Sequence, residues 1–186
     1  KDATKSIEGI RTGTEGISLS FQANAPPPKI HVESGVDERL NSFEVVLELR
    51  NKGAFPQPEN RISAPPGRVY LSGYDQSIIS FDKNPPVEDF SGKSLEGKST
   101  INPNGGLDIV TFKGQVNVNN LNVEKYEPTL LATACYQYFT VAGPLVCIDP
   151  DPYTTINQKK VCQVQGITLS NQGAPVAVTK IDEEAL

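Results

Sequence analysis

The chain has 186 residues, a formal net charge of −5 and a pI near 5.0. Its 37% hydrophobic and 21% charged residues exclude a disordered chain, and its length allows one large domain or two small ones. The acidic balance excludes binding to a nucleic-acid backbone, which requires clustered lysine and arginine. Fifteen glycines and fifteen prolines, without a collagen period, predict many turns between short elements. Because methionine is absent, we expect a processed product or an excised segment.

The first residues, 1–14, predict a polar lead-in to the main domain. Only Ala3–Arg11 has a helical pattern, and Ile7 and Ile10 give it too little apolar surface to dock firmly. We therefore expect a frayed segment, or the end of an N-terminal helix. The residues that follow, 15–165, are predicted to form one β-sandwich domain.

Two segments early in that domain alternate between apolar and polar residues, which is the period of a half-buried strand. The shorter one is Ile17–Phe21, which ends before the three prolines that start at Pro26. Asn51-Lys52-Gly53 is predicted to close the longer one with a turn in which Gly53 takes a positive φ. That longer strand is Phe43–Arg50, with Phe43, Val45, Leu47 and Leu49 predicted to face the core.

The rest of the chain repeats short β-like segments between turn-rich stretches. Ala54–Gly67 is predicted to be a long edge loop and Asn84–Thr100 an exposed excursion, because both are rich in turn-forming residues. Without alternating helices, this order predicts an all-β fold, an antiparallel sandwich or barrel. The further strands are predicted at 68–72, 78–81, 107–118 with a break at Gly114, 129–141, 145–148, 161–169 and 174–181.

One charge-free run, Pro128–Ile148, is long enough to span a bilayer. Its polar residues and its Gly143-Pro144 break interrupt the apolar character, so we interpret it as a buried hairpin. No membrane span is predicted within the chain.

All three cysteines, Cys135, Cys147 and Cys162, lie in the last third of the chain. Their C-x11-C and C-x14-C spacings, and the distance of the only histidine, argue against a zinc site. We predict a disulfide between Cys147 and Cys162, which bracket a polar loop, with Cys135 buried as a free thiol. The alternatives are a Cys135–Cys147 bridge in a hairpin that turns near Val141, and three buried thiols. A disulfide favours an exported protein.

The sequence carries no pattern typical of catalysis. The single histidine, His31, lies in an alternating stretch, and we interpret it as a solvent-facing strand residue. Asp149 and Asp151 offer hard oxygen ligands that suit calcium, but Asp-Pro is common turn chemistry, and we prefer that interpretation. We predict no catalytic residue, no metal and no cofactor, and we expect that the chain is not an enzyme.

Phe43–Gly53 resembles the strand and Asn-x-Gly pattern of CARDB-type immunoglobulin-like modules in prokaryotic surface proteins. Further stretches resemble archaeal surface proteins anchored by an N-terminal membrane helix; they are Gly13–Gly16, Val69–Gly73, Ala132–Tyr136 and Cys147–Pro152. The resemblance implies an antiparallel immunoglobulin-like β-sandwich with long proline- and glycine-rich loops. It also implies a cell-surface protein without catalytic residues, since these modules generally have none.

Two stretches far apart in the chain are alike. Gly16–Ala23 and Gly166–Gly173 match at five of eight positions, at an offset of 150 residues. Chance similarity between two short strands is one explanation. The functional alternative is that residues 166–186 are the first strand of a following repeat, or a strand donated to a neighbouring subunit, which would build a filament. The residues predicted to make that contact are Ile167, Leu169, Val176 and Val178.

These features predict an extracellular structural or adhesive module of a surface layer, stalk or filament. Its expected partners are copies of itself or neighbouring proteins of the cell surface. The alternative is a carbohydrate-binding module with glycans as ligands. Because tryptophan is absent, its aromatic platform would come from the six tyrosines, Tyr70, Tyr74, Tyr126, Tyr136, Tyr138 and Tyr153.

Overall fold

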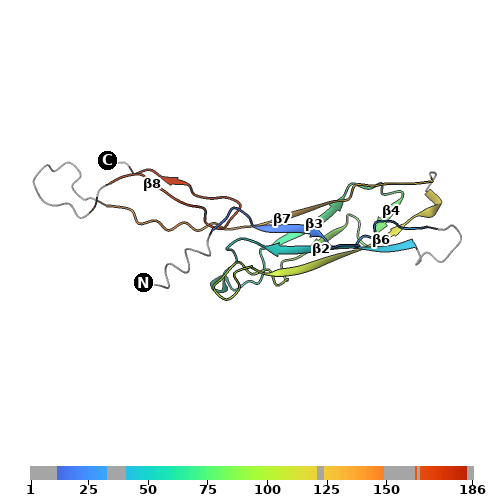
Figure 1. The fold of residues 1–186 in the computed structure, drawn as a ribbon, viewed down its shortest axis with the longest axis horizontal. Helices are drawn as coiled ribbons and strands as arrows, with labels where there is room; N and C mark the ends of the chain where they lie inside the picture. Colours follow the sequence, from blue (N-terminus) through green and yellow to red (C-terminus); the bar gives the residue numbers. More distant parts are fainter. Residues whose placement is uncertain (1–11, 33–40, 121–123, 149–161, 163, 184–186) are drawn as a thin grey trace, which may run out of the picture.

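The computed structural model describes residues 12–32, 41–120, 124–148, 162 and 164–183. Their regular structure consists of two larger antiparallel sheets and a small two-stranded one (Figure 1). The four-stranded sheet has the order β1-β2-β6-β4, formed by Ile17–Phe21, Ser42–Asn51, Leu107–Val116 and Ile79–Phe81 in that order. The three-stranded sheet has the order β5-β3-β7, formed by Val87–Asp89, Gly67–Ser72 and Leu131–Tyr136.

The remaining elements are short. β8, Ile167–Thr168, pairs with β9, Lys180–Ile181, outside the two larger sheets. Single 3-10 turns lie at Pro58–Asn60 and Val118–Asn120. The helix expected at Ala3–Arg11 lies outside the described residues.

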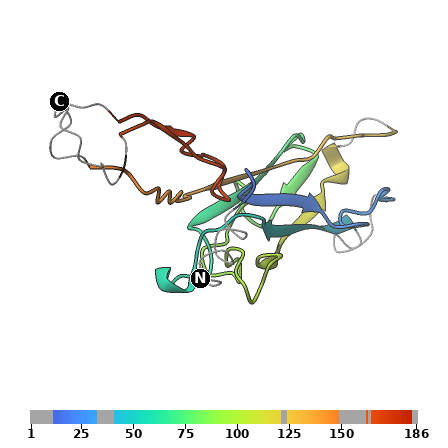
Figure 2. The same cartoon turned by 60° about the vertical axis from the view of Figure 1, so that its left-hand side comes forward.

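The core lies between the two larger sheets (Figure 2). Phe43, Val45, Leu47 and Leu49 of β2 are buried on one face, as their alternation predicts. Val45 and Leu47 stand opposite Phe112 and Val110 of β6, and Val69 and Leu71 of β3 pack onto the same cluster from the second sheet. The predicted all-β, antiparallel fold is confirmed, and its layers are sandwich-like.

The predicted break at Gly114 is wrong, because β6 runs unbroken from Leu107 to Val116. Gly114 stands opposite Phe43 in the β2–β6 register. A Cβ at this position would approach the Phe43 ring to 2.6 Å, so the glycine makes room for a core aromatic within a continuous strand.

The two stretches predicted as exposed loops contribute to the core. Asn84–Thr100 contains β5, and its Phe90 and Leu95 are fully buried, which corrects the expectation of an exposed excursion. Residues 54–66 form no strand, as predicted, and only Gly67 belongs to β3, yet the loop buries Phe55 and Ala64. Long loops can cover a sandwich with isolated apolar side chains that have no periodicity to reveal them.

The last third of the chain departs most from expectation. β7 ends at Tyr136, and 145–148 is not a strand, so the predicted buried hairpin within Pro128–Ile148 does not form. β7 pairs with β3 instead, and most of the following apolar side chains are exposed. Two longer strands are predicted at 161–169 and 174–181. Among the described residues, each contains a strand of only two residues, β8 and β9.

Candidate interaction surface

Beyond Tyr136 the chain leaves the sandwich and forms an arm, a name we use for residues 137–148, 162 and 164–183. The arm extends from one end of the sheets and makes the molecule elongated (Figures 1 and 2). Its outgoing segment, 137–148, continues the direction of β7, and its returning part contains β8 and β9. In the returning part, Ile167 stands opposite Ile181, and Leu169 N–H donates to Thr179 O at 2.9 Å.

The hydroxyl of Tyr138 ties the outgoing segment to the sandwich. It accepts a hydrogen bond from Phe55 N–H at 3.1 Å and donates one to Asn51 Oδ1 at 3.2 Å. Burial raises the pKa of Tyr138 to about 12, although the bond from Phe55 lowers it, and nearby Tyr136 adds to the rise. The Tyr138 ring also meets the Phe55 ring edge-on, with 5.4 Å between centroids. A neutral phenol therefore links the arm to the end of β2.

The partner of this phenol, Asn51, is fully buried and uses its whole side-chain amide. Its Nδ2 donates to Phe55 O at 2.7 Å and to Leu95 O at 2.8 Å. Its Oδ1 accepts from Gly53 N–H at 3.1 Å as well as from Tyr138. A buried amide with every group paired holds one geometry, because any displacement leaves a polar group without a partner.

Gly53 lies at the same attachment, but its backbone conformation differs from the prediction. Its φ is not positive; among the described glycines, only Gly13, Gly73, Gly105 and Gly173 have positive φ. A Cβ at Gly53 would instead overlap the Tyr138 hydroxyl and lie 2.6 Å from Glu15 O. Glycine is needed here so that the arm can approach the backbone closely.

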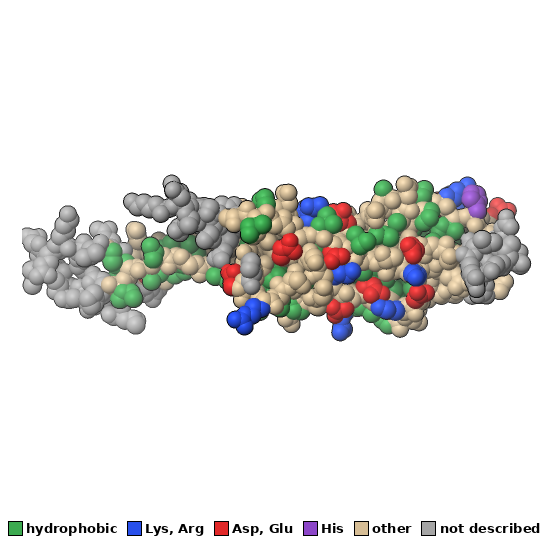
Figure 3. Space-filling model, turned by 90° about the horizontal axis from the view of Figure 1, so that it is seen from below, with side chains coloured by type: hydrophobic (Ala, Val, Ile, Leu, Met, Phe, Trp, Pro, Cys, Tyr) green, Lys and Arg blue, Asp and Glu red, His purple; other side chains and the backbone are tan. Residues whose placement is uncertain are grey.

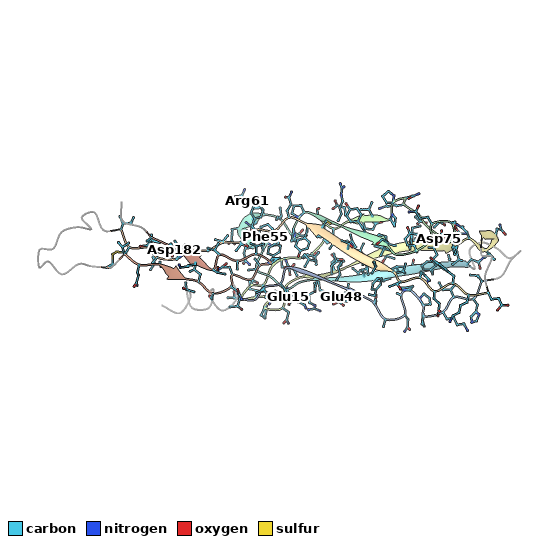
Figure 4. All side chains as sticks on the ribbon, turned by 90° about the horizontal axis from the view of Figure 1, so that it is seen from above. Glu15, Glu48, Phe55, Arg61, Asp75 and Asp182 are labelled. Atoms are coloured by element: carbon cyan, nitrogen blue, oxygen red, sulfur yellow. A yellow bond between two sulfur atoms is a disulfide. The ribbon has the colours of Figure 1, made fainter. Side chains whose placement is uncertain are left out.

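The returning part of the arm makes a second attachment beside the first. Ala54 N–H donates to Gly173 O at 2.7 Å, and Gly173 N–H donates to Gly13 O at 3.1 Å. The next residue, Ala174, is buried. Figure 4 shows Phe55 at this attachment, at the end of the sandwich from which the arm extends. We call the set of Asn51, Gly53, Phe55, Tyr138 and Gly173 the joint.

The outgoing segment exposes large apolar side chains on alternate residues. Phe139 is 61% exposed, Val141 63% and Leu145 96%, while the residues between them are mostly half-buried. Alternation of this kind is the pattern of a strand. Among the described residues, no backbone hydrogen bond reaches 138–148. In the part of the chain that the structure describes, residues 138–148 thus have an apolar side and no backbone partner, which are the features of an edge that pairs with other chains.

Charged side chains of both signs gather over the sandwich, whereas the arm shows mainly hydrophobic and uncharged ones on the face drawn in Figure 3. The outgoing segment itself contains no charged residue. An exposed apolar surface next to a charged one marks an interaction site more often than a solvated surface.

The four residues predicted to make self-association contacts all lie on the returning part. Val176 and Val178 are exposed, and Ile167 and Leu169 are half-buried. Thr140 Oγ1 of the outgoing segment donates to Val176 O at 2.5 Å, so the two parts of the arm meet there. Gln172 bonds both backbone groups of Val178, at 2.9 Å to N–H and 3.0 Å to C=O. The backbone of Val178 is consequently occupied within the arm.

A disulfide joins the two parts of the arm. The structure pairs Cys147 with Cys162, the pairing favoured from the sequence, with 5.9 Å between the Cα atoms. Cys135 is free, as predicted, but it is exposed rather than buried. The reason is the pleat of β7, which turns Ala134 and Tyr136 toward the core and Cys135 away from it. The alternative Cys135–Cys147 bridge is not present.

The described residues offer no sign of a metal centre. No three histidine, cysteine, aspartate or glutamate side chains gather there. His31 is exposed, as predicted, but it lies outside any strand. Asp149 and Asp151 lie outside the described residues. In the part of the chain that the structure describes, no helix is long and apolar enough to cross a membrane.

A groove of about 690 Å³ opens at the opposite end of the sandwich. It is lined by the core residues Phe43 and Ile79, by the partly buried Val116, and on two sides by residues 26–32 and by 124–128 with Leu130. Tyr126, in the second side, accepts a hydrogen bond from Asp75 N–H at 2.7 Å. Figure 4 shows Asp75 and Asp182 at opposite ends of the molecule, so the groove is remote from the arm.

Sequence reasoning names four apolar residues of the returning part, but it predicts a buried hairpin for the outgoing segment and misses the joint. The sequence suggests only a possible sugar-binding role for Tyr136 and Tyr138. The one signal for the joint is their spacing of two residues in a charge-free stretch, which places both side chains on the same face of an extended chain. Comparisons with protein-family models, with curated proteins and with solved structures find no match to the chain. The proposed function therefore rests on the geometry of the arm and the groove.

Proposed function

We propose that this chain is a non-catalytic structural or adhesive module of an extracellular surface layer, stalk or filament, and that it acts by self-association through the arm. The observation that carries the proposal is that residues 138–148 have no backbone partner among the described residues and expose the apolar side chains of Phe139, Val141 and Leu145. A soluble monomer that exposed such an edge without a partner would be prone to uncontrolled aggregation. Pairing the edge with another molecule satisfies its backbone and covers its side chains.

The joint supports this proposal because it gives the arm a fixed direction. Buried hydrogen bonds at Tyr138 and Asn51 and two backbone bonds at Gly173 attach both parts of the arm to one end of the sandwich. A site held by packed and paired groups binds with less loss of conformational entropy than a mobile segment does. The arm is thus suited to repeated contacts of one geometry.

An extracellular setting is supported by the Cys147–Cys162 disulfide, since disulfides persist in oxidising compartments. The packing of four and three antiparallel strands around one core supports a β-sandwich of the immunoglobulin-like kind, and we propose the CARDB-type assignment on the sequence resemblance alone. We keep the archaeal cell surface as the proposed location on the resemblance alone.

The predicted role of residues 166–186 remains part of the proposal, as the first strand of a following repeat or as a donated strand. Val176 and Val178 expose their side chains on the arm and suit a contact with a neighbouring copy. Replacing both by aspartate tests this role, since strand donation requires their burial.

Glycan binding receives less support from the same residues. The tyrosines at 70, 74, 126, 136 and 138 are half-buried, and Tyr153 lies outside the described residues. Tyr126, Tyr136 and Tyr138 also use their hydroxyls in hydrogen bonds within the fold. A sugar platform needs an aromatic face that is free, so we propose no second function.

The test is the assembly state of the purified, oxidised chain. We expect sedimentation to show larger species as protein concentration rises, and electron microscopy to show fibres or lattices. A chain that stays monomeric at every accessible concentration, with its disulfide intact, would contradict the proposed function.

A further inference from the structure

The groove at the far end of the sandwich has the features of an acceptor for an extended strand. Its lining includes the buried core residues Phe43 and Ile79 and the partly buried Val116, which packs against the core. Its charged residues, which include Lys29, Lys125 and Glu127, are exposed. An occupant without charges could therefore reach the apolar floor without burying an unpaired charge.

One side of this groove is formed by residues that have no backbone partner in the described part of the chain. Residues 124–130 lead directly into β7, and among the described residues none of their backbone groups takes part in a backbone hydrogen bond. The opposite side starts with Pro26, Pro27 and Pro28, which have no N–H to donate. The two sides therefore cannot pair fully with each other, and 124–130 offers its edge to an added strand.

The arm has the chemistry that this groove would accept. Its outgoing segment is charge-free, residues 138–148 take part in no backbone hydrogen bond among the described residues, and Phe139, Val141 and Leu145 expose apolar side chains. Residues 139–145 are as many as the seven of 124–130, and at about 3.3 Å per residue the two would match in length. Because the groove and the arm lie at opposite ends, the arm cannot fill the groove of its own molecule (Figure 1).

We propose that the groove receives residues 139–145 of the arm of a second copy of this chain, paired along the 124–130 edge. This inference rests on the proposed self-association and names its acceptor. The contact joins two different surfaces, so every copy keeps a free arm at one end and a free groove at the other. Such heterologous contacts do not close unless the rotation between copies brings the ends together, and they otherwise build an open filament.

Cross-linking between two different variants tests the acceptor directly. Both variants carry Cys135→Ser to remove the exposed thiol; one has Val141→Cys in the arm, and the other has Pro27→Cys at the groove. They are mixed and treated with a short bismaleimide under conditions in which the native disulfide stays oxidised. We expect a cross-linked heterodimer whose joined peptides contain positions 141 and 27, and a ladder of multimers when one chain carries both substitutions.

The control acceptor is Ile62→Cys, also combined with Cys135→Ser. Ile62 is an exposed apolar residue close to the place where the arm is attached to the sandwich. Cross-linking of position 141 to position 62 but not to position 27, in a chain that associates, would overturn the groove assignment and leave the proposed function standing. A chain that neither associates nor cross-links would overturn both.

Discussion

At the scale of single residues, the hydroxyl of Tyr138 lies where the arm, the end of β2 and the loop after β2 meet. It accepts from Phe55 N–H and donates to Asn51 Oδ1, and Asn51 in turn bonds Phe55 O and Leu95 O. Removing the hydroxyl therefore leaves Phe55 N–H without its acceptor. The side-chain amide of Asn51 stays paired through its bonds to Gly53 N–H, Phe55 O and Leu95 O. The cost of one such unpaired buried group is about 1–3 kcal/mol.

The pH dependence of stability should report this hydroxyl. Burial raises the pKa of Tyr138 to about 12 from the ordinary 10.0, so the folded state favours the neutral phenol. Above pH 10.0 the unfolded chain loses this proton while the folded chain keeps it, and the free energy of unfolding should fall until about pH 12. Tyr138→Phe lacks this contribution. We expect the wild type to be more stable by about 1–2 kcal/mol at neutral pH, and the difference to shrink across that range.

Urea unfolding of both proteins at a series of pH values measures this difference. Other tyrosines and lysines titrate in both chains, so their effects cancel in the comparison. A difference that stays constant up to pH 12 would show that the Tyr138 hydroxyl ionises as freely in the folded chain as in the unfolded one.

Gly53, in the loop after β2, offers a second residue-scale prediction, and Gly143 in the arm provides a matched control. Gly53→Ala would place its Cβ on the Tyr138 hydroxyl, so the arm or the loop must shift, and we expect a loss of about 2 kcal/mol or more. Gly143→Ala meets no atom within 4 Å, and its effect should stay within about 0.5 kcal/mol. Chemical denaturation of both variants decides. Equal losses of stability in the two variants would show that the joint accommodates a Cβ at Gly53 without destabilising the fold.

At the scale of elements, periodicity predicted the strands that have one buried and one exposed face. β2 follows its alternation closely, and the bounds of β1, β3 and β4 agree with prediction to within one residue, although in β1 Phe21 is exposed and Ser18 is half-buried. Side chains of Phe90 and Leu95 escaped prediction because isolated apolar residues in loops have no period. Gly114 misled because a glycine that yields space to Phe43 cannot be distinguished in sequence from one that ends a strand.

The candidate site was only partly predictable for a related reason. An apolar, charge-free stretch such as 137–148 usually belongs inside a protein, and nothing in its composition says that it will be exposed. Its exposure follows from the topology, because β7 is already paired with β3 and the chain continues past the end of the sandwich. The groove also depends on tertiary structure, since its two sides are about a hundred residues apart in the chain.

The disulfide should stabilise the arm and leave the sandwich unaffected. Closing a loop of about 15 residues removes roughly 3 kcal/mol of unfolded-state freedom in the chain-entropy model. We expect that replacing Cys147 and Cys162 together by serine makes residues 137–183 more susceptible to limited proteolysis, while β2 and β6 stay resistant. Cys135→Ser is the control, because that thiol is exposed and unpaired with any other cysteine.

Mass mapping of the fragments, with and without reduction, locates both the cuts and the bridge. If cleavage rises equally in β2 and β6, the arm and the sandwich unfold as one unit, and the arm is not a separate element of stability.

At the scale of the whole molecule, the arm with its charge-free outgoing segment lies at one end, and the segments that line the groove lie at the other (Figure 1). The net charge of −5 is modest, so long-range repulsion between copies is small and is screened further by salt. Apolar contact rather than charge should therefore drive assembly, and the association should vary little with ionic strength.

The most direct measurement of this account compares two aspartate substitutions in the oxidised full chain by sedimentation. Leu145, in the arm, is 96% exposed and Ile101, in a loop of the sandwich, is 94% exposed, so neither substitution should disturb the fold. Burying Leu145 in an interface would contribute about 1.5–3 kcal/mol, so Leu145→Asp should weaken association by about tenfold or more. Ile101→Asp should associate like the wild type. Equal association of all three chains would contradict the central claim that the arm is the surface through which copies meet.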